Sequence, residues 1–316
     1  MLFILTFCLF IGCKRDVKEG SAATASESNA ASSGSTATGF SGTAAYNYAK
    51  AQVDFGPRVP GTPAAKKAGD WIISQMRSRA DTVIVQSFLY TTKDGKKLPL
   101  RNILARFRPD LTERVLYLTH WDSRPTSDAP GATEAQKKIP VPGANDGASG
   151  VGMFVALGDA LKKTKPNVGV DLLFTDGEDY GDFGPPEVDV LIGAKYFANH
   201  LPSPGYKPLY GVLWDMIGDK DLRIPYEMNS FQQVPEVVSR VWQTAADMGY
   251  GNVFVQESGG AVIDDHVPLL NAGLRVIDVI DLTYPPHHTP QDTMDKISPR
   301  SLAIVGDVAT ALVTRK

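Results

Sequence analysis

Short apolar runs alternate along this chain with amphipathic segments of helical period. The runs are rich in β-branched and aromatic residues, as strands are, and predict strands over Thr82–Leu89, Asn102–Phe107, Val115–Leu118, Val170–Phe174, Tyr210–Trp214 and Leu274–Ile280. The helical patterns cover Ala64–Arg79, Ala148–Lys163, Gly193–His200, Val234–Met248 and Pro299–Thr314. Because strands alternate with helices, we expect an α/β fold with a largely parallel sheet that helices cover on both faces.

The N-terminal segment has a different character from the rest of the chain. Residues 1–13, MLFILTFCLFIGC, are almost wholly apolar but too few to span a bilayer, so a signal segment fits them better. FIGC resembles a bacterial lipobox, which implies lipidation of Cys13, although no Lys or Arg precedes the run; the alternative is a signal peptide that is simply removed. Residues 14–44 have the composition of a low-complexity tether. We therefore expect an exported protein of the cell envelope, held to a bacterial membrane only by this anchor.

Composition limits what the remaining residues, 45–316, can do. They contain no second low-complexity break, which predicts a single domain. Both cysteines, Cys8 and Cys13, precede that domain, so it can form neither a disulfide nor a thiolate metal site. The chain has 32 Lys+Arg against 35 Asp+Glu and a net charge of −3, which lacks the basic footprint of a nucleic-acid-binding protein.

Acidic and imidazole side chains follow almost every predicted strand. They are His120, Asp122, Asp146, Glu178, Asp179, Asp215, Asp264, Asp265, His266, His287 and His288. In open parallel sheets the chemistry gathers where the strands end, and zinc takes imidazole nitrogen and carboxylate oxygen. Two histidines and three carboxylates from separate strand ends are sufficient for one zinc, or for two that share a carboxylate, and a carboxylate that binds no metal could act as general base.

Each of these residues taken alone has an ordinary structural explanation. An Asp at a strand end often caps a helix or forms a turn, Glu178-Asp179 fits a solvated loop, and His287-His288 fits a surface pair. Their shared placement after apolar runs favours a common site. Other chemistries are excluded, because the sequence has no GxSxG nucleophile elbow, no HExxH zinc helix and no phosphate-binding loop.

Six ordered motifs resemble those of the zinc aminopeptidase and glutaminyl cyclase superfamily: HxDS, GAxDxASG, DGE followed by an acid, LWDMIG, DDHxPxL and HT. The resemblance runs from about Val53 to Asp295. It implies a three-layer sandwich around a mixed, mostly parallel sheet. By position, it implies that the principal zinc ligands are Asp146, Asp179 and His288, and that Glu178 is the general acid/base. His120 and Asp215 match positions that hold a second zinc in the aminopeptidases and only support the single zinc of animal-type cyclases.

Features of the sequence point to both branches of the superfamily. Asp264, the first acid of DDH, is typical of the cyclases, where it joins a carboxylate network with Asp215 and the general acid/base. Asp179, followed by Tyr180 and Gly181, also resembles bacterial cyclase-like members, although most relatives have Glu at this position. Against the cyclases, His287 stands where they commonly have Trp, and Asp278 lies near the place of a network histidine. The string HTPQDT is closer to the aminopeptidase form of that loop.

The resemblance thus implies a glutaminyl-peptide cyclotransferase of the animal type, with one zinc, that acts on the N-termini of peptides or proteins and converts glutamine to pyroglutamate. Its catalytic residues would be Glu178, Asp215 and Asp264. Tyr284 matches a cyclase pocket position, while Trp121, Tyr180 and Phe183 are weaker candidates for pocket walls that ordinary packing explains equally well. The alternative is an aminopeptidase with two zincs. A third reading is a peptide-binding lipoprotein without activity.

Overall fold

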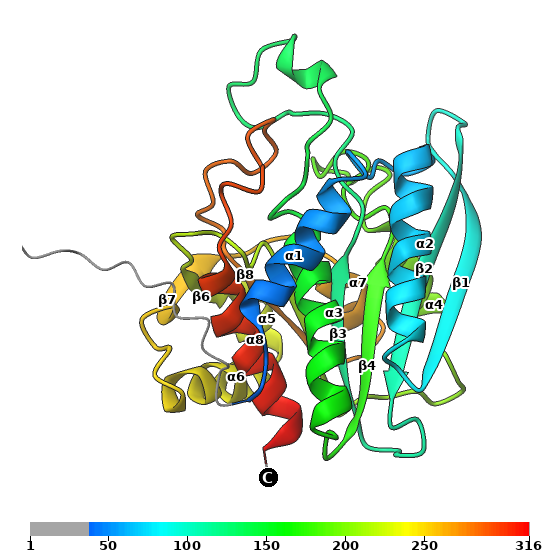
Figure 1. Cartoon of the computed structure of the whole chain (residues 1–316). Coiled ribbons are helices and arrows are strands. Elements are labelled where there is room, and N and C mark those ends of the chain that lie inside the picture. The colour runs from blue at the N-terminus through cyan, green and yellow to red at the C-terminus, as the bar shows by residue number, and fades with distance from the viewer. Residues whose placement is uncertain (1–37, 316) are drawn as a thin grey trace, which may run out of the picture. The chain divides into compact units, whose positions relative to one another are not determined.

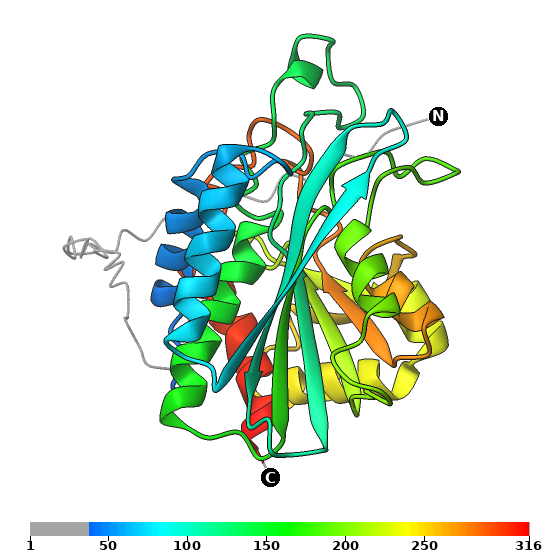
Figure 2. The same ribbon diagram turned by 90° about the vertical axis from the view of Figure 1, so that its right-hand side faces the viewer.

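A six-stranded sheet forms the centre of the fold, in the order β1-β2-β4-β3-β5-β8 (Figures 1 and 2). The strands are β1 Thr82–Thr91, β2 Lys97–Phe107, β3 Arg114–His120, β4 Gly169–Thr175, β5 Tyr210–Asp215 and β8 Val276–Ile280. Strands β4, β3, β5 and β8 run parallel to one another, and β2 is antiparallel both to β4 and to the edge strand β1. The mixed, mostly parallel sheet predicted from the sequence is therefore confirmed.

The computed structural model describes residues 38–315. The predicted signal segment, the lipidation site Cys13 and most of the predicted tether lie outside the described residues.

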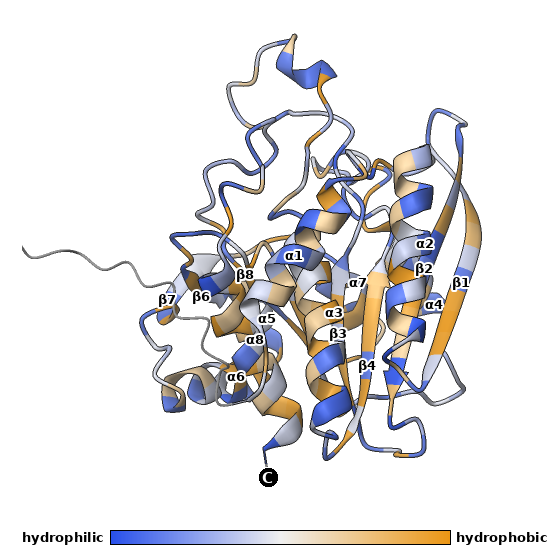
Figure 3. Cartoon of the chain, in the orientation of Figure 1, coloured by the Kyte–Doolittle hydropathy of each residue, from blue (hydrophilic) through white to orange (hydrophobic). Residues whose placement is uncertain are grey.

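Helices cover both faces of this sheet, which confirms the three-layer prediction. The helices on one face are α1 Gly42–Val53, α2 Pro63–Arg77, α3 Ala148–Lys163 and α8 Pro299–Thr314; those on the other are α4 Ile192–Asn199 and α7 His266–Asn271 (Figure 2). Alternate side chains of β3 pack on opposite faces of the sheet. Val115 and Tyr117 pack in the core under α1, α2, α3 and α8, and Leu116 and Leu118 pack in the core under α4 and α7. The hydropathy colouring follows this core along β2 and β4 (Figure 3).

A smaller assembly packs beside the edge strand β8. It consists of the two-stranded sheet β6 Ile224–Glu227 and β7 Phe254–Gly260, with helices α5 Met228–Gln233 and α6 Pro235–Asp247. A 3-10 turn, η1 Gln136–Lys138, lies in the long loop between β3 and α3. No helix within residues 38–315 is both long and apolar enough to cross a membrane.

The first helix begins inside the stretch that its composition assigned to the tether. The hydroxyl of Ser41 accepts a hydrogen bond from Ala44 N (3.2 Å) and caps α1, and Phe40 before it is buried. The same small residues that give this segment a low-complexity composition allow α1 to pack closely against its neighbours. A Cβ on Gly42 would lie 2.8 Å from Ala303 N in α8, so only glycine fits there.

The close approach of α1 and α3 leads to a stability prediction. A Cβ on Gly152 of α3 would lie 2.8 Å from Ala49 N and would also clash with the carbonyl of Ala45, both backbone atoms of α1. We therefore expect Gly152→Ala to lower the free energy of unfolding by about 1–3 kcal/mol, because the helices must move apart. Urea denaturation followed by circular dichroism measures this loss.

Gly158→Ala is the matched control in the same helix. Its nearest new neighbours belong to the flexible side chains of Arg79 and Met76, which can move. The better helix propensity of alanine should leave this variant close to the parent in stability. Equal losses for the two variants would contradict the close-approach explanation.

Candidate metal centre

The ends of three parallel strands and the loops beside them deliver the candidate side chains to one place. His120 is the last residue of β3, Asp215 the last of β5, and Glu178 and Asp179 lie in the turn after β4. The other members come from connecting segments: Asp146 just before α3, Asp264 just before α7, and His287 and His288 between β8 and α8.

Two residues of this region have left-handed backbone although neither is glycine. They are Met216 (φ 45°), directly after Asp215, and His288 (φ 55°). Such conformations cost free energy and persist where the surrounding structure imposes them, most often at functional sites.

The carboxylate of Asp146 connects two groups of donors. Within the described residues, His120, Asp146 and Asp215 form one group of three whose donor atoms lie within 4.8 Å of one another, and Asp146, His287 and His288 form another. Asp146 Oδ1 lies 3.0 Å from His120 Nε2, and Asp146 Oδ2 lies 3.7 Å from His288 Nε2. Asp146 thus faces both groups, as a carboxylate that bridges two metals does.

The charges around Asp146 favour its ionised form. Burial alone would raise the pKa of Asp146, but the hydrogen bond and charge of His120, with the charges of His288 and His287, lower it below its ordinary value. For His120, burial opposes the charged form, and Asp215, Asp122 and Asp146 outweigh it, so that its pKa is raised.

The donor chemistry of this centre fits zinc. Asp146 Oδ2, Asp179 Oδ2 and His120 Nδ1 are buried and have no hydrogen-bond partner in the described part of the chain. Buried polar atoms without partners are costly, and carboxylate oxygens beside imidazole nitrogens are the ligands that zinc accepts.

Asp179 belongs to neither group of three donors, and an arginine side chain binds it instead. Its Oδ1 accepts a hydrogen bond from Arg124 Nη1 at 2.7 Å and lies 3.4 Å from His288 Nε2. The guanidinium of Arg124 also binds both oxygens of Asp128, at 2.6 and 2.7 Å, and Asp128 in turn lies 3.7 Å from His288 Nδ1. Arg124 therefore ties together two of the predicted ligands.

Two carboxylates to which the sequence analysis gave no role hold the loops of the site. Asp122 accepts hydrogen bonds from the backbone N–H groups of Glu178 and Asp179, both at 3.1 Å. Asp292 accepts from the N–H groups of Asn145 (2.8 Å) and Asp146 (3.1 Å). Both lie within the motifs HxDS and HTPQDT, but only the folded backbone shows which N–H groups they bind.

A cavity of about 340 Å³ opens beside the candidate ligands. Its polar side is formed by Asp146, Glu178, Asp215, Asp264, His287 and His288. Its apolar side includes Phe183, Met216, Val262, Ile263, Ile280 and Leu282. The structure thus places the predicted residues Glu178, Asp215, Asp264 and Phe183 on one cavity, and His120 directly behind it.

Three of the predicted wall residues lie elsewhere. Trp121, directly after His120, is buried and lines a different cavity, beside α2 and the β1–β2 hairpin. Tyr284 packs behind Met216 and Ile280, and its hydroxyl donates to Asp292 Oδ1 at 2.7 Å, so it supports the wall without lining the cavity. Tyr180 accepts a hydrogen bond from Lys96 Nζ at 2.9 Å, outside the cavity.

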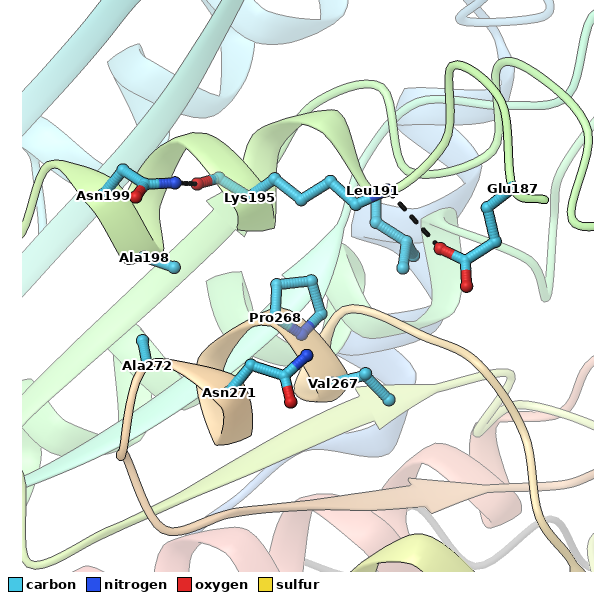
Figure 4. Close-up of a pocket in the computed structure, with 9 residues that line it drawn as sticks. All are labelled: Glu187, Leu191, Lys195, Ala198, Asn199, Val267, Pro268, Asn271 and Ala272. Carbon is cyan, nitrogen blue, oxygen red and sulfur yellow. Dashed lines mark hydrogen bonds and ion pairs between the residues drawn. The ribbon is translucent and has the colours of Figure 1, made fainter.

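Another cavity, of about 350 Å³, lies between α4 and α7 and lacks this chemistry (Figure 4). Its charged residues are Lys195 and Glu187, which face each other at 3.5 Å. Neither group of three donors contributes to it, so it is not the candidate reaction site.

Comparison with known proteins identifies the family. The profile of peptidase family M28 matches residues 102–313. The chain belongs to this family. Zinc is the cofactor that the family implies, in agreement with the donor set.

Solved structures from both branches of the family are similar to the chain. The glutaminyl cyclase of Porphyromonas gingivalis is 39% identical, with a TM-score of 0.82 over 86% of this chain and 97% of that one. A leucine aminopeptidase precursor from Bacteroides thetaiotaomicron is 33% identical, with a TM-score of 0.84 over 88% of this chain and 98% of that one. A probable zinc metalloprotease of Leptosphaeria maculans is 31% identical over 182 residues, 53% of this chain, but the match spans only 39% of the fungal protein.

The buried ion-pair network around Arg124 leads to a second stability prediction. Arg124→Met would leave the carboxylates of Asp179 and Asp128 without their shared cation. Loss of one partner of a buried ion pair costs about 3–5 kcal/mol. We expect a loss of this size in urea denaturation of the metal-free protein.

Arg275→Met is the control, because Arg275 pairs with Glu236 at 3.2 Å on the surface with both side chains about half exposed. An exposed pair of this kind contributes at most about 1 kcal/mol. If both variants lost the same stability, Arg124 would not have the central role assigned to it.

Proposed function

We propose that this protein is a zinc-dependent glutaminyl-peptide cyclotransferase, which converts the N-terminal glutamine of a peptide to pyroglutamate and releases ammonia. The observation that carries the proposal is the position of Asp264. Its buried carboxylate lines the same cavity as Glu178 and Asp215, in the arrangement that the DDH motif of cyclases implies. The similarity to the Porphyromonas gingivalis cyclase over nearly the whole described chain supports the proposal.

The size and lining of the cavity also suit this substrate. Its volume of about 340 Å³ is near the lower end of the roughly 300–1,000 Å³ of ligand pockets. It has room for one N-terminal residue, whose aliphatic stem would lie against Val262, Ile280 and Phe183, with the polar groups converging at one end.

Glu178 would move the proton. The α-amine attacks the side-chain amide carbon, a C–N bond forms, and the bond from that carbon to the amide nitrogen breaks. Glu178 takes the proton from the attacking amine and gives it to the departing nitrogen, which leaves as ammonia. Burial, with the charges of Asp179 and Asp264, raises the pKa of Glu178 above its ordinary value, which suits a group that must hold a proton between the two steps.

Asp215 and Asp264 would adjust the pKa of Glu178. Burial, with the charges of Asp215 and Asp265, raises the pKa of Asp264. The cluster extends inward to Asp278, whose pKa burial and Asp264 also raise, and whose Oδ2 lies 3.8 Å from His266 Nδ1. Buried carboxylates whose charges raise one another's pKa cannot all ionise and share protons instead.

The resemblance assigns the principal zinc to Asp146, Asp179 and His288. When bound there, zinc supplies Lewis-acid polarisation of the side-chain carbonyl of the substrate. The chain's own part is to hold the glutamine in the cavity, keep water away with the apolar wall and present Glu178 to the amine.

A two-zinc aminopeptidase is the second candidate, because the His120–Asp146–Asp215 group offers a second metal position. His120 Nε2 lies 3.0 Å from Asp146 and 3.1 Å from Asp215. In that reaction His120 and Asp215 are ligands, and Glu178 moves a proton from the attacking water to the leaving amine. Replacement of His120 would then abolish activity, whereas in a cyclase it would only weaken it.

We also propose that the domain is exported and anchored to the membrane through a lipid on Cys13. The signal-like run 1–13 and the Ser/Ala-rich residues after it support this. The catalytic domain would then act on peptide N-termini in the cell envelope.

Two peptides that differ only in an N-terminal Gln or Leu separate the candidate functions. With zinc-loaded protein from residue 38 onward, we expect mass spectrometry to show loss of ammonia from the Gln peptide and no change in the Leu peptide. Glu178→Gln should slow this reaction roughly 100- to 10,000-fold, the usual contribution of a general acid/base. Release of free leucine would establish the aminopeptidase, and no reaction of either peptide would favour a binding protein.

The two aromatic residues Phe183 and Trp121 test the assignment of the cavity. Phe183→Ala should raise KM for the Gln peptide at least roughly 10-fold, since one methylene of an apolar pocket already accounts for such a factor. Trp121→Phe, which changes a residue outside the cavity, should leave KM unchanged. Steady-state kinetics of ammonia release gives the KM of both variants. A KM that rises in Trp121→Phe and stays unchanged in Phe183→Ala would refute the assignment of Phe183 to the cavity wall.

A further inference from the structure

His287 is the pocket residue whose chemistry the proposed function does not use. It stands next to His288 in the segment between β8 and α8, where the cyclases commonly have Trp. Its imidazole lines the cavity and is about half exposed, with 45% of its side-chain surface accessible. The His287 and His288 rings lie against each other at 3.7 Å between centroids with a tilt of 41°, and both imidazoles face the same carboxylate.

That carboxylate is Asp146, and the distances are those of an incompletely closed metal site. His287 Nε2 lies 3.9 Å and His288 Nε2 lies 3.7 Å from Asp146 Oδ2. Ligands of a tetrahedral zinc with bonds of about 2.0–2.1 Å lie about 3.4 Å apart. The donor atoms of Asp146, His287 and His288 all lie within 4.8 Å of one another, and both imidazole distances to Asp146 Oδ2 are within 0.5 Å of this spacing.

The surroundings of Asp146 Oδ2 suit a bound cation. The side chain of Asp146 is only 5% exposed, and this oxygen has no hydrogen-bond partner among the described residues. An ionised oxygen so placed is costly unless a cation compensates it.

The other predicted ligand, Asp179, is placed less directly. Arg124 holds its Oδ1 at 2.7 Å, and no atom of Asp179 joins the group formed by Asp146 and His288. Asp179 Oδ2 has no hydrogen-bond partner within residues 38–315, so a ligand role for His287 does not require that Asp179 leave the set.

We propose that His287 is a direct ligand of the principal zinc, beside Asp146 and His288. The chain thereby adds a second imidazole to a centre that the resemblance equips with one. The inference shares the zinc cofactor with the proposed function but does not depend on which peptide reaction follows.

The experiment counts imidazole ligands by X-ray absorption spectroscopy at the zinc edge, on protein loaded with one equivalent of zinc. We expect the count to fall by one in His287→Phe relative to the native protein. The matched control is His200→Phe, which removes an exposed histidine that is likewise stacked on a ring, that of Tyr196 at 4.0 Å, and it should leave the count unchanged. Equal counts in the native protein and in His287→Phe overturn the proposal.

Zinc affinity, measured by competition with a chromophoric chelator, gives a second readout. His287→Phe should weaken binding by more than the roughly 10- to 100-fold that loss of an outer-sphere partner costs, and an unchanged affinity contradicts the ligand role. If the native protein releases no ammonia from the Gln peptide, the proposed function fails while the imidazole count still decides the role of His287.

Discussion

The site depends on one buried negative charge, the carboxylate of Asp146. Its two oxygens face different imidazoles, His120 on one side and His288 with His287 on the other. Its backbone is fixed independently of its side chain, because Asp292 accepts hydrogen bonds from the N–H groups of Asn145 and Asp146. A carboxylate held by its main chain keeps both oxygens available, and the other groups of the centre are arranged around them.

In the neighbouring turn, too, one carboxylate holds the main chain and leaves the side chains free. Asp122 binds the main-chain N–H groups of Glu178 and Asp179 and leaves their side chains free to face the cavity and Arg124. Asp122 and Asp292 are themselves almost completely buried, so their charges depend on the N–H groups they accept. Burial and the charge of Asp146 raise the pKa of Asp292 to about 7. The charge state of Asp292, which accepts hydrogen bonds from the main chain of Asn145 and Asp146, therefore depends on the charge of Asp146.

Much of this arrangement could be predicted from the sequence, and the parts that could not share a physical cause. Apolar runs marked the core strands, and polar residues directly after them marked the edge where the chemistry lies, because parallel strands end on the same side. The sheet β6–β7 and helices α1, α5 and α7 were missed. Helix α1 begins in a segment of low-complexity composition, Gln256, Glu257 and Ser258 break the apolar pattern of β7, and α7 is a short six-residue helix. Trp121 and Tyr284 were misplaced because membership of a motif does not say on which side of the backbone a side chain lies. The pairing of Arg124 with Asp179 joins residues 55 positions apart, which no local pattern reveals.

The crowding of carboxylates around one cavity has a consequence for the lifetime of the protein. Glu178, Asp179, Asp215 and Asp264 lie with Asp146 in a buried region whose nearby cations include Arg124, the buried Arg58 and the imidazoles. A metal that binds this folded arrangement and not the unfolded chain adds its binding free energy to the folding equilibrium. The supply of zinc would therefore determine the fraction of folded protein that escapes proteolysis, as well as the activity of each molecule. A shortage of zinc would lower the amount of the protein itself.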